Sequence, residues 1–285
     1  MPNFKVTIGG VTIALVSADD QEINIKARYR PFQTAGNCQA VLRIHQGSFP
    51  LIKMGKINFD SGATWCFGTA WGKNILHFYN LDFGSHPYQT VVLKKNFSSG
   101  DIYLNPQAKK LNIYPFQYPF DEIYFIHLFS LGVGILTHSC GINDQGRGLL
   151  FLGASGAGKS TMAKLWEKEK GVTILNDDRV LVRQWQGTPY IFGTPWYGKS
   201  QVCCADRAPL KGIYFLKKAN KNCLKALSPA ETAARIAATA FLPFWDKKGI
   251  EFALSFCVEI ARKIPAWEIG FVPDKNIVDF VRSQF

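Results

Sequence analysis

The sequence predicts a mixed α/β protein in two parts, a β-rich domain over residues 1–117 and an α/β domain over residues 118–285. Short β-rich runs separated by Gly, Asn and Ser turns fill the first part. Segment 114–119 contains two prolines and is typical of a junction, and helical and strand patterns alternate after it. With 285 residues, of which 47% are hydrophobic, the chain is long enough to bury a core in each part.

The first part contains several strand-like runs and many aromatic residues. The runs are residues 6–8, 11–16, 41–44, 90–93 and 101–104. The aromatic residues include Trp65, Phe67, Trp71, Phe78 and Tyr79. Aromatic residues on strands usually pack in a core, and this interpretation is favoured here. The alternative is an aromatic groove that binds a peptide.

The second part begins with a predicted helix near Phe120 that continues over residues 123–131. A strand over 134–138, a turn at 143–146 and a strand over 148–152 then predict a β-hairpin. Further strands are predicted over 172–175, 179–183, 189–192 and 212–216. Helices are predicted over 229–239 with Ser228 as the N-cap, over 250–263, and from Pro273 to the C-terminus.

A glycine-rich loop follows the predicted strand 148–152 and precedes an amphipathic helix over 162–167. Its residues are Gly153, Ala154, Ser155, Gly156, Ala157, Gly158, Lys159 and Ser160, followed by Thr161. This is a G-x-x-x-x-G-K-[ST] motif, in which glycines let backbone N–H groups surround phosphates and the lysine reaches the β/γ oxygens. The serine hydroxyl of such a loop binds Mg²⁺. The motif predicts ATP and Mg²⁺ as ligands of residues 153–161, and the alternative is a glycine loop without a ligand.

Two carboxylates, Asp177 and Asp178, follow the apolar run 172–175 at a predicted strand end. At that position an acidic residue can reach the Mg²⁺ held by Ser160. Adjacent carboxylates suggest divided roles, Asp177 toward the metal and Asp178 toward a substrate hydroxyl. The alternative is that residues 176–178 only form a turn or a cap.

These residues resemble the HPr kinase/phosphorylase superfamily, whose members phosphorylate a serine of a small phosphocarrier protein. The loop has the form G-x-S-G-x-G-K-S, residues 177–180 resemble the family's aspartate pair, and His138 lies upstream on the strand before the hairpin. The resemblance implies that Lys159 binds the β/γ phosphates, that Asp178 accepts the hydroxyl proton and that His138 supports Asp178. It also implies a P-loop, HPr-kinase/PEP-carboxykinase-like mixed sheet with flanking helices.

The likeness covers about residues 118–275 and has one clear departure. The E-I-R-G segment of the bifunctional enzymes has no counterpart, and the tetrapeptide Gly-Thr-Pro-Trp at 193–196 occupies that region. This departure argues against a second metal carboxylate, and it leaves open whether the reverse phosphorylase activity exists. The segment is more similar to divergent HPr-kinase-like proteins, some of them associated with peptide modification. It makes Thr194, Trp196, Lys199 and Arg207 candidates for the substrate side, or parts of a strand–turn–strand around a buried tryptophan.

The predicted function is an ATP- and Mg²⁺-dependent kinase that transfers the γ-phosphoryl group to a hydroxyl, with a serine of a peptide or small protein as the expected acceptor. Two alternatives stay open: a nucleotide-binding regulatory module with little or no transferase activity, and a small-molecule or carboxykinase-like kinase. The acceptor's identity does not follow from a fold-level likeness. The resemblance also implies a homo-oligomer.

The charge, hydropathy and cysteine content of the chain argue against nucleic-acid-binding, membrane-spanning, secreted and disulfide-rich proteins. The formal charge is +12, but the lysines and arginines are dispersed, so nucleic acid is not expected as a partner. The longest apolar run, 124–136, is shorter than the ~20 residues of a membrane span. No signal pattern is visible at the N-terminus, so a cytoplasmic location is expected. The seven cysteines form no C-x-x-C pair, and neither a disulfide framework nor a zinc site is expected.

Overall fold

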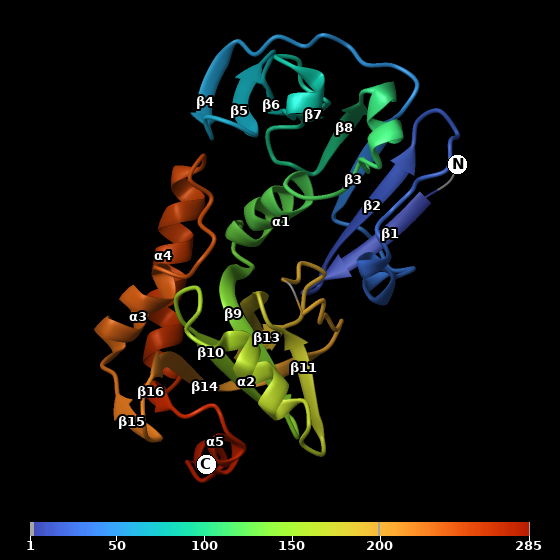
Figure 1. The fold of residues 1–285 in the computed structure, drawn as a ribbon. Helices are drawn as coiled ribbons and strands as arrows, with labels where there is room; N and C mark the ends of the chain where they lie inside the picture. Colours follow the sequence, from blue (N-terminus) through green and yellow to red (C-terminus); the bar gives the residue numbers. More distant parts are fainter. Residues whose placement is uncertain (1–2, 199, 285) are drawn as a thin grey trace. The chain divides into compact units, whose positions relative to one another are not determined.

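The computed structural model describes residues 3–198 and 200–284, and has a mixed α/β fold with two mixed sheets (Figure 1). The chain divides into two compact units, Met1–Leu128 (unit 1) and Phe129–Phe285 (unit 2). This division falls eleven residues after the predicted junction at 117/118, within helix α1 (Phe120–Ser130). The difference has a physical cause, because the first turns of α1 belong to the core of unit 1. The ring of Phe120 lies 5.8 Å from that of Phe78, between centroids.

Unit 1 is built on one eight-stranded sheet with the order β1-β2-β3-β8-β7-β6-β5-β4. Strands β2, β3 and β8 run parallel to one another, and every other neighbouring pair is antiparallel. The strands are β1 (Asn3–Ile8), β2 (Val11–Ser17), β3 (Ala40–His45), β4 (Lys56–Asp60), β5 (Trp65–Ala70), β6 (Lys73–Phe78), β7 (Gln89–Leu93) and β8 (Ser99–Leu104). The predicted runs correspond to β1, β2, β3, β7 and β8. Strands β4, β5 and β6 lie in the aromatic-rich segment, for which no strand was predicted.

The aromatic residues of unit 1 mostly support its core. Phe67 and Phe78 are buried, whereas Trp71 is 75% exposed in the turn between β5 and β6. Helix α1 is mostly apolar, has no separate polar face and is buried along its length, as expected for a core helix. Its Asp121 is fully buried and accepts hydrogen bonds from the Tyr29 hydroxyl and, at 2.7 Å, from the Arg28 guanidinium. This network satisfies a charge that would otherwise be costly to bury.

Unit 2 contains a mixed sheet in which five strands close on themselves. The order is β10-β9-β12-β13-β14-β16-β15, β14 also pairs parallel with β10, and β11 pairs with β9. The hairpin of β9 and β10 forms around Gln145 and Gly146, both with positive φ, in the predicted turn. The strands are β9 (Gly134–Asp144), β10 (Arg147–Leu152), β11 (Val172–Asn176), β12 (Arg179–Trp185), β13 (Thr188–Phe192), β14 (Arg207–Lys218), β15 (Cys223–Ala226) and β16 (Ala266–Phe271).

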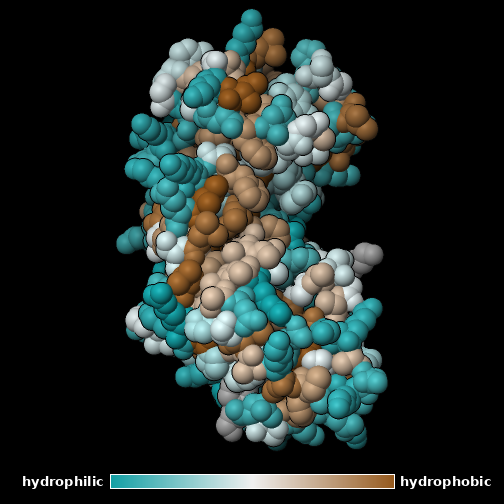
Figure 2. Space-filling model, turned by 90° about the vertical axis from the view of Figure 1, so that its left-hand side faces the viewer, coloured by the Kyte–Doolittle hydropathy of each residue, from teal (hydrophilic) through white to brown (hydrophobic). Residues whose placement is uncertain are grey.

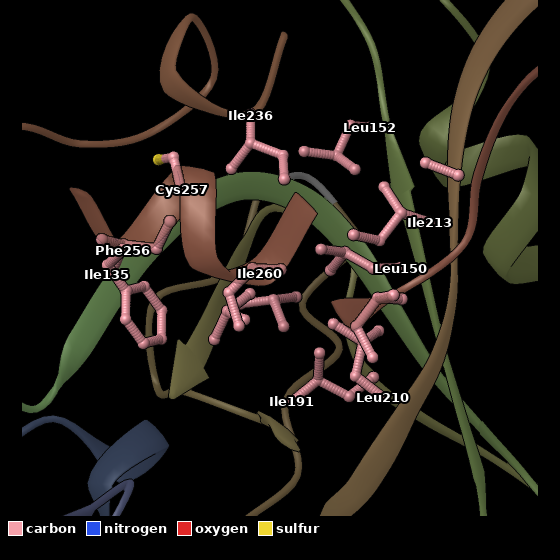
Figure 3. Close-up of a cluster of buried hydrophobic side chains, with 14 of the residues drawn as sticks. Ile135, Leu150, Leu152, Ile191, Leu210, Ile213, Ile236, Phe256, Cys257 and Ile260 are labelled. Carbon is pink, nitrogen blue, oxygen red and sulfur yellow. The ribbon is translucent and has the colours of Figure 1, made fainter. Parts of the chain in front are cut away.

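Two apolar cores lie on the two faces of strand β10. Leu150 and Leu152 point into one core, with Ile213 of β14 and with side chains from two helices (Figure 3). Leu149 and Phe151 point into the other, with helices α2 and α5. Successive residues of a strand alternate between faces, so a strand buried on both faces is apolar throughout. The continuous apolar run that precedes the glycine loop therefore has a structural reason.

Four helices flank this sheet. They are α2 (Lys159–Trp166), α3 (Pro229–Ala237), α4 (Lys247–Lys263) and α5 (Asn276–Arg282). Helices α3 and α4 contribute Ile236, Phe256 and Ile260 to the first core (Figure 3). The predicted cap Ser228 accepts a hydrogen bond from the N–H of Glu231, whose carboxylate in turn accepts one from the N–H of Ser228.

Hydrophobic side chains gather in a stripe on the face of unit 2 that carries α3 and α4 (Figure 2). Leu254 and Val258, one turn apart on α4, and Phe244 before it are among the exposed large apolar residues. No helix within 3–198 or 200–284 has both the length and the apolar character that crossing a membrane requires.

Candidate functional site

The glycine loop, residues 153–160, joins the end of β10 to the first turn of α2. Gly158 is the N-cap of α2 and has φ 113°, a backbone conformation that strongly favours glycine. A Cβ atom at Gly158 would lie 2.5 Å from Cζ of Phe271, so no larger residue fits without movement of that ring. The loop thus has its observed shape because glycine occupies this position.

Lys159 is buried at the first position of α2, and its ammonium faces the loop. Nζ donates hydrogen bonds to the carbonyl oxygens of Gly153 at 2.7 Å and Ala154 at 3.2 Å. Burial lowers the pKa of Lys159, although the nearby charge of Asp178 opposes this effect. The lysine is therefore held over the same loop whose backbone it would help to present to a phosphate group.

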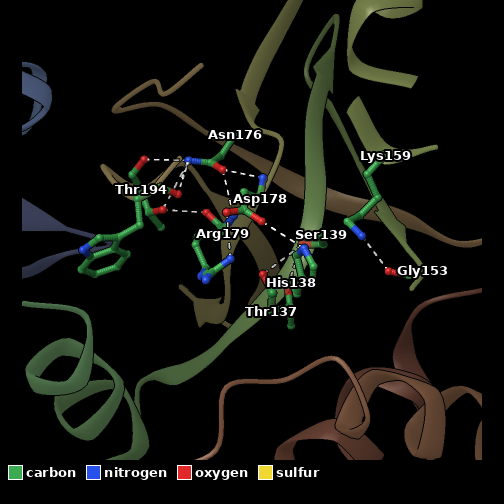
Figure 4. A network of polar contacts seen from close by, with 10 residues as sticks. Thr137, His138, Ser139, Gly153, Lys159, Asn176, Asp178, Arg179 and Thr194 are labelled. Atoms are coloured by element: carbon green, nitrogen blue, oxygen red, sulfur yellow. Dashed lines mark hydrogen bonds and ion pairs between the residues drawn. The ribbon is translucent and has the colours of Figure 1, made fainter. Parts of the chain in front are cut away.

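Asp178 lies between two cationic or hydrogen-bonding side chains (Figure 4). Its Oδ1 lies 3.0 Å from Nε2 of His138, and its Oδ2 lies 2.9 Å from Nη1 of Arg179. His138 and Arg179 are directly opposite each other in the antiparallel pair β9–β12, which brings both side chains to one carboxylate. The guanidinium carbon of Arg179 lies 4.2 Å from the centroid of the Phe241 ring.

The environment of Asp178 favours its ionised form. Partial burial alone would raise the pKa of this carboxyl, but the hydrogen bond from His138 and the charges of Arg179 and Lys159 outweigh it and lower the pKa. Asp178 is therefore a carboxylate at neutral pH, and its two oxygens are oriented by two different elements of the sheet.

Asn176 organises the turn that carries both aspartates, and sequence reasoning did not single it out. Its Oδ1 accepts hydrogen bonds from the backbone N–H groups of Asp178 at 2.7 Å and Arg179 at 2.8 Å. Its Nδ2 donates to the carbonyl oxygens of Thr194 at 2.9 Å and Trp196 at 3.1 Å (Figure 4). An Asn at the start of a turn is a recognised signal for this geometry. The turn at 176–178, which the sequence offered as the alternative interpretation of these residues, therefore forms, and it positions the aspartates.

Asp177 is the second carboxylate of the turn and is 3% exposed. Its Oδ1 atom is buried and has no hydrogen-bond partner among residues 3–198 and 200–284. Buried carboxylate oxygens normally have a partner, so this atom has capacity for a ligand. Ser160 and Thr161, which line the same cavity, have exposed side chains. These oxygen donors fit Mg²⁺, which binds through one or two carboxylates together with phosphate oxygens and water.

No cluster of three or more His, Cys, Asp or Glu side chains that could hold a metal ion occurs in the described part of the chain. A site with only one or two protein ligands is expected for an ion that also binds phosphate oxygens, because most of the ion's ligands then come from the nucleotide and water. The residues of the chain that fit such an ion are Ser160 and Asp177.

One cavity of about 420 Å³ brings most of the predicted residues together. It is lined by His138, Ser155, Gly156, Gly158, Lys159, Ser160, Thr161, Asp177, Asp178 and Gly198. Gly153, Ala154 and Ala157 belong to the loop but not to the lining. Gly198 was not predicted, and a Cβ atom there would lie 3.3 Å from Oδ2 of Asp178. A larger residue at position 198 would therefore press on the carboxylate of Asp178.

The candidates for the substrate side have other environments. Thr194 is fully buried and donates a hydrogen bond of 2.6 Å to the carbonyl oxygen of Arg179, and Trp196 is 3% exposed. The exposed Arg207 lies over the rings of Trp185 and Phe192. None of these three lines the cavity, and the alternative interpretation of a strand–turn–strand around a buried tryptophan describes Thr194 and Trp196. Lys199 lies outside the described residues.

The cavity combines a glycine-rich loop that can accept an anion, a buried lysine, the side-chain oxygens of Ser160 and Asp177, and an oriented carboxylate. Such a set can bind a polyphosphate and hold a hydroxyl group beside it. No protein-family model matches the chain, and no curated protein matches it.

Proposed function

We propose that this chain is an ATP- and Mg²⁺-dependent kinase that transfers the γ-phosphoryl group to a hydroxyl, with a serine of a peptide or small protein as the acceptor. The observation that carries the proposal is the shared cavity, in which Lys159 and Ser160 of the glycine loop lie with Asp178 and its partner His138. The resemblance of these residues to the HPr kinase/phosphorylase superfamily supports the same reaction and a P-loop, HPr-kinase/PEP-carboxykinase-like fold for unit 2.

In the proposed reaction, the backbone N–H groups of the glycine loop and the Lys159 ammonium bind the phosphates. To do so, Lys159 exchanges its hydrogen bonds to the carbonyl groups of Gly153 and Ala154 for bonds to phosphate oxygens. Mg²⁺, when bound by Ser160 and Asp177, supplies positive charge that offsets the charge of the phosphates. The chain contributes mainly positioning and electrostatic stabilisation.

Asp178 orients the acceptor hydroxyl and receives its proton. The hydroxyl oxygen forms a bond to the γ-phosphorus, the bond from that phosphorus to the β–γ bridging oxygen breaks, and ADP leaves. The proton of the hydroxyl goes to Asp178, whose carboxylate is kept ionised by His138 and Arg179. His138 acts through Asp178 and is a positioning residue.

The test is transfer of label from γ-labelled ATP in the presence of Mg²⁺, with serine-containing peptides and free serine as acceptors. We expect label in an acceptor with the wild type and loss of at least about a hundredfold in rate with Asp178→Asn or Lys159→Ala. Asp279→Asn, a change of an exposed carboxylate in α5, is the matched control and keeps the wild-type rate.

The outcomes separate the alternatives. Label in free serine but in no peptide supports a small-molecule kinase. If the wild type binds ATP but labels no acceptor, and Asp178→Asn behaves identically, the catalytic assignment fails and a regulatory nucleotide-binding module takes its place.

A further inference from the structure

The two edges of the unit 1 sheet differ in how they are covered. At the β1 edge, the segment after residue 32 pairs with the strand: Thr34 donates its N–H to the carbonyl oxygen of Lys5 at 3.1 Å, and Val6 forms a bridge with Gln33. At the other edge, β4 pairs with β5 and with no other strand of the described chain. Four of the five residues of β4 are exposed. An open edge is a template for another extended chain.

Two cavities flank the first half of this open strand. One, of about 450 Å³, is lined in part by Met54 and Ile57. The other, of about 420 Å³, is lined in part by Gly55 and Lys56. In chain order, Met54 lines the first cavity, Gly55 and Lys56 line the second, and Ile57 lines the first again.

The strand register places the two cavities on opposite faces of the sheet. The 450 Å³ cavity reaches Cys66 and His77, which are directly paired between β5 and β6. The 420 Å³ cavity reaches Thr69 and Asn74, which are also directly paired. Directly paired residues share a face, and positions 66 and 69 are an odd number of residues apart, so the pairs lie on different faces.

The 450 Å³ cavity, here called the apolar cavity, fits a bulky hydrophobic side chain. Most of its lining is apolar, from Pro50, Leu51, Ile52, Met54, Ile57 and Pro87. Leu51 is 79% exposed and Ile57 is 59% exposed, so two large aliphatic side chains border its mouth in solvent. Burying them against a ligand would remove apolar surface from water, which favours binding.

The 420 Å³ cavity, here called the lysine cavity, fits a carboxylate. Lys56 and Lys95 line it, both are exposed, and neither takes part in an ion pair within the described residues. The exposed indole of Trp71 lies at the same cavity. No acidic residue is part of the lining. The charge of this cavity is therefore positive, and an acidic side chain is its complement.

We propose that the first half of β4 binds an extended peptide as an added strand, with a bulky apolar side chain in the apolar cavity and an acidic side chain in the lysine cavity. Because the cavities lie on opposite faces, the two side chains stand an odd number of positions apart in the peptide. In this arrangement, backbone hydrogen bonds between the peptide and β4 provide affinity. The two cavities determine how the peptide is aligned along the strand. The proposal rests on unit 1 alone and does not depend on the kinase activity.

The test compares short threonine-rich peptides of identical composition, each with one leucine, one glutamate and a fluorescent label. In one set leucine and glutamate are adjacent, in either order, and in the other a single threonine separates them. Fluorescence anisotropy with the full chain, without nucleotide, measures their affinities. We expect one adjacent peptide to bind about tenfold more tightly than both separated peptides. Lys159→Ala, which disables the proposed kinase, leaves this binding unchanged.

The lysine cavity is tested by reversing the charge of Lys56 and, separately, the charge of the peptide. Because the reversed peptide should bind the variant better than the wild type, a misfolded variant cannot produce the expected result. Lys56→Glu weakens binding of the glutamate peptide by about five- to tenfold. A peptide in which lysine replaces glutamate then binds Lys56→Glu better than the wild type. Lys110→Glu, at an exposed lysine remote from β4 in sequence, is the matched control and binds as the wild type does.

Three results overturn the proposal. Equal affinity of adjacent and separated peptides means that the cavities do not set a register. No binding of any peptide means that Lys53 and Lys56 protect the edge rather than recognise a partner. A dimer in light scattering that Lys56→Glu dissociates, together with no peptide binding, means that a second copy of this chain occupies the edge.

Discussion

The Nε2 atom of His138 lies 3.0 Å from the Oδ1 atom of Asp178, across the antiparallel pair β9–β12. This contact is one of the causes that keep the pKa of Asp178 below its ordinary value. It links a strand of the hairpin before the glycine loop to the turn that carries both aspartates. The pH dependence of the proposed reaction should therefore depend on His138, which acts through Asp178.

His138→Leu is expected to move the acid limb of the kcat/KM profile for phosphoryl transfer to higher pH. Leucine removes the hydrogen bond to Asp178, so the pKa of that carboxyl rises and the carboxylate is lost at a higher pH. His138→Gln can still donate a hydrogen bond and is expected to shift the limb less. Rate measurements from pH 7 downward check this, and coincident acid limbs for all three proteins would contradict it.

The pKa of Asp178 also predicts how its contribution to stability varies with pH. Because the folded-state pKa lies below the ordinary value of 3.8, the ionised carboxylate stabilises the fold at pH values above 3.8. This contribution is lost as the pH falls from 3.8 through the folded-state value. The difference in unfolding free energy between the wild type and Asp178→Asn is thus expected to be constant near neutral pH and to shift against the wild type in acid. Urea unfolding across this range measures it, and a difference that is independent of pH refutes it.

Sequence patterns predicted the parts of unit 2 where local signals and burial agree. The Gly–Lys–Ser loop, the apolar run of β10 and the Ser228 cap each have a local reason, and each predicted element forms. The mixed α/β class follows from their alternation. Strands β15 and β16 were not predicted. Strand β15 has only four residues, three of them exposed, and β16 contains a glutamate and a glycine among its six residues.

The sequence predicted those parts of the candidate site whose functional residues are adjacent in the chain, namely the loop 153–161 and the pair Asp177 and Asp178. His138 and Asp178 are forty positions apart in the chain, and the β9–β12 register brings them together. The role of Asn176 was not predicted, since its amide bonds to Thr194 and Trp196 connect segments that only the fold makes neighbours. The same bonds explain why Thr194 and Trp196 belong to the scaffold of the turn rather than to the cavity.

Gly158→Ala is expected to destabilise the chain more than Gly156→Ala. Both glycines have positive φ, 113° and 78°, so alanine costs about 1–2 kcal/mol of backbone strain at either position. At Gly158 the new Cβ also meets the Phe271 ring, whereas nothing lies within 4 Å at Gly156. The clash adds about 1–3 kcal/mol. Urea unfolding of both variants checks the order.

A second substitution, at Phe271, shows whether the clash with its ring makes Gly158→Ala more costly than Gly156→Ala. Phe271→Ala removes the ring, so Gly158→Ala should cost less in the Phe271→Ala background than in the wild type. A double-mutant cycle measures the coupling. Equal costs in both backgrounds would show that strain in the loop, and not the ring, limits position 158.

Asn176→Ala is expected to lower the unfolding free energy by about 3–5 kcal/mol, because it leaves two backbone N–H groups and two carbonyl groups without their partner in a buried turn. Thr194→Val removes the bond to the carbonyl oxygen of Arg179 and a longer bond of 3.5 Å from Nδ2 of Asn176. It is the matched comparison and should cost about 1 kcal/mol. Since Asn176 orients Asp178 without lining the cavity, Asn176→Ala should reduce kcat for phosphoryl transfer more than it changes KM for ATP. An equal loss of ATP binding would instead place the effect on the glycine loop and remove Asn176 from the positioning of Asp178.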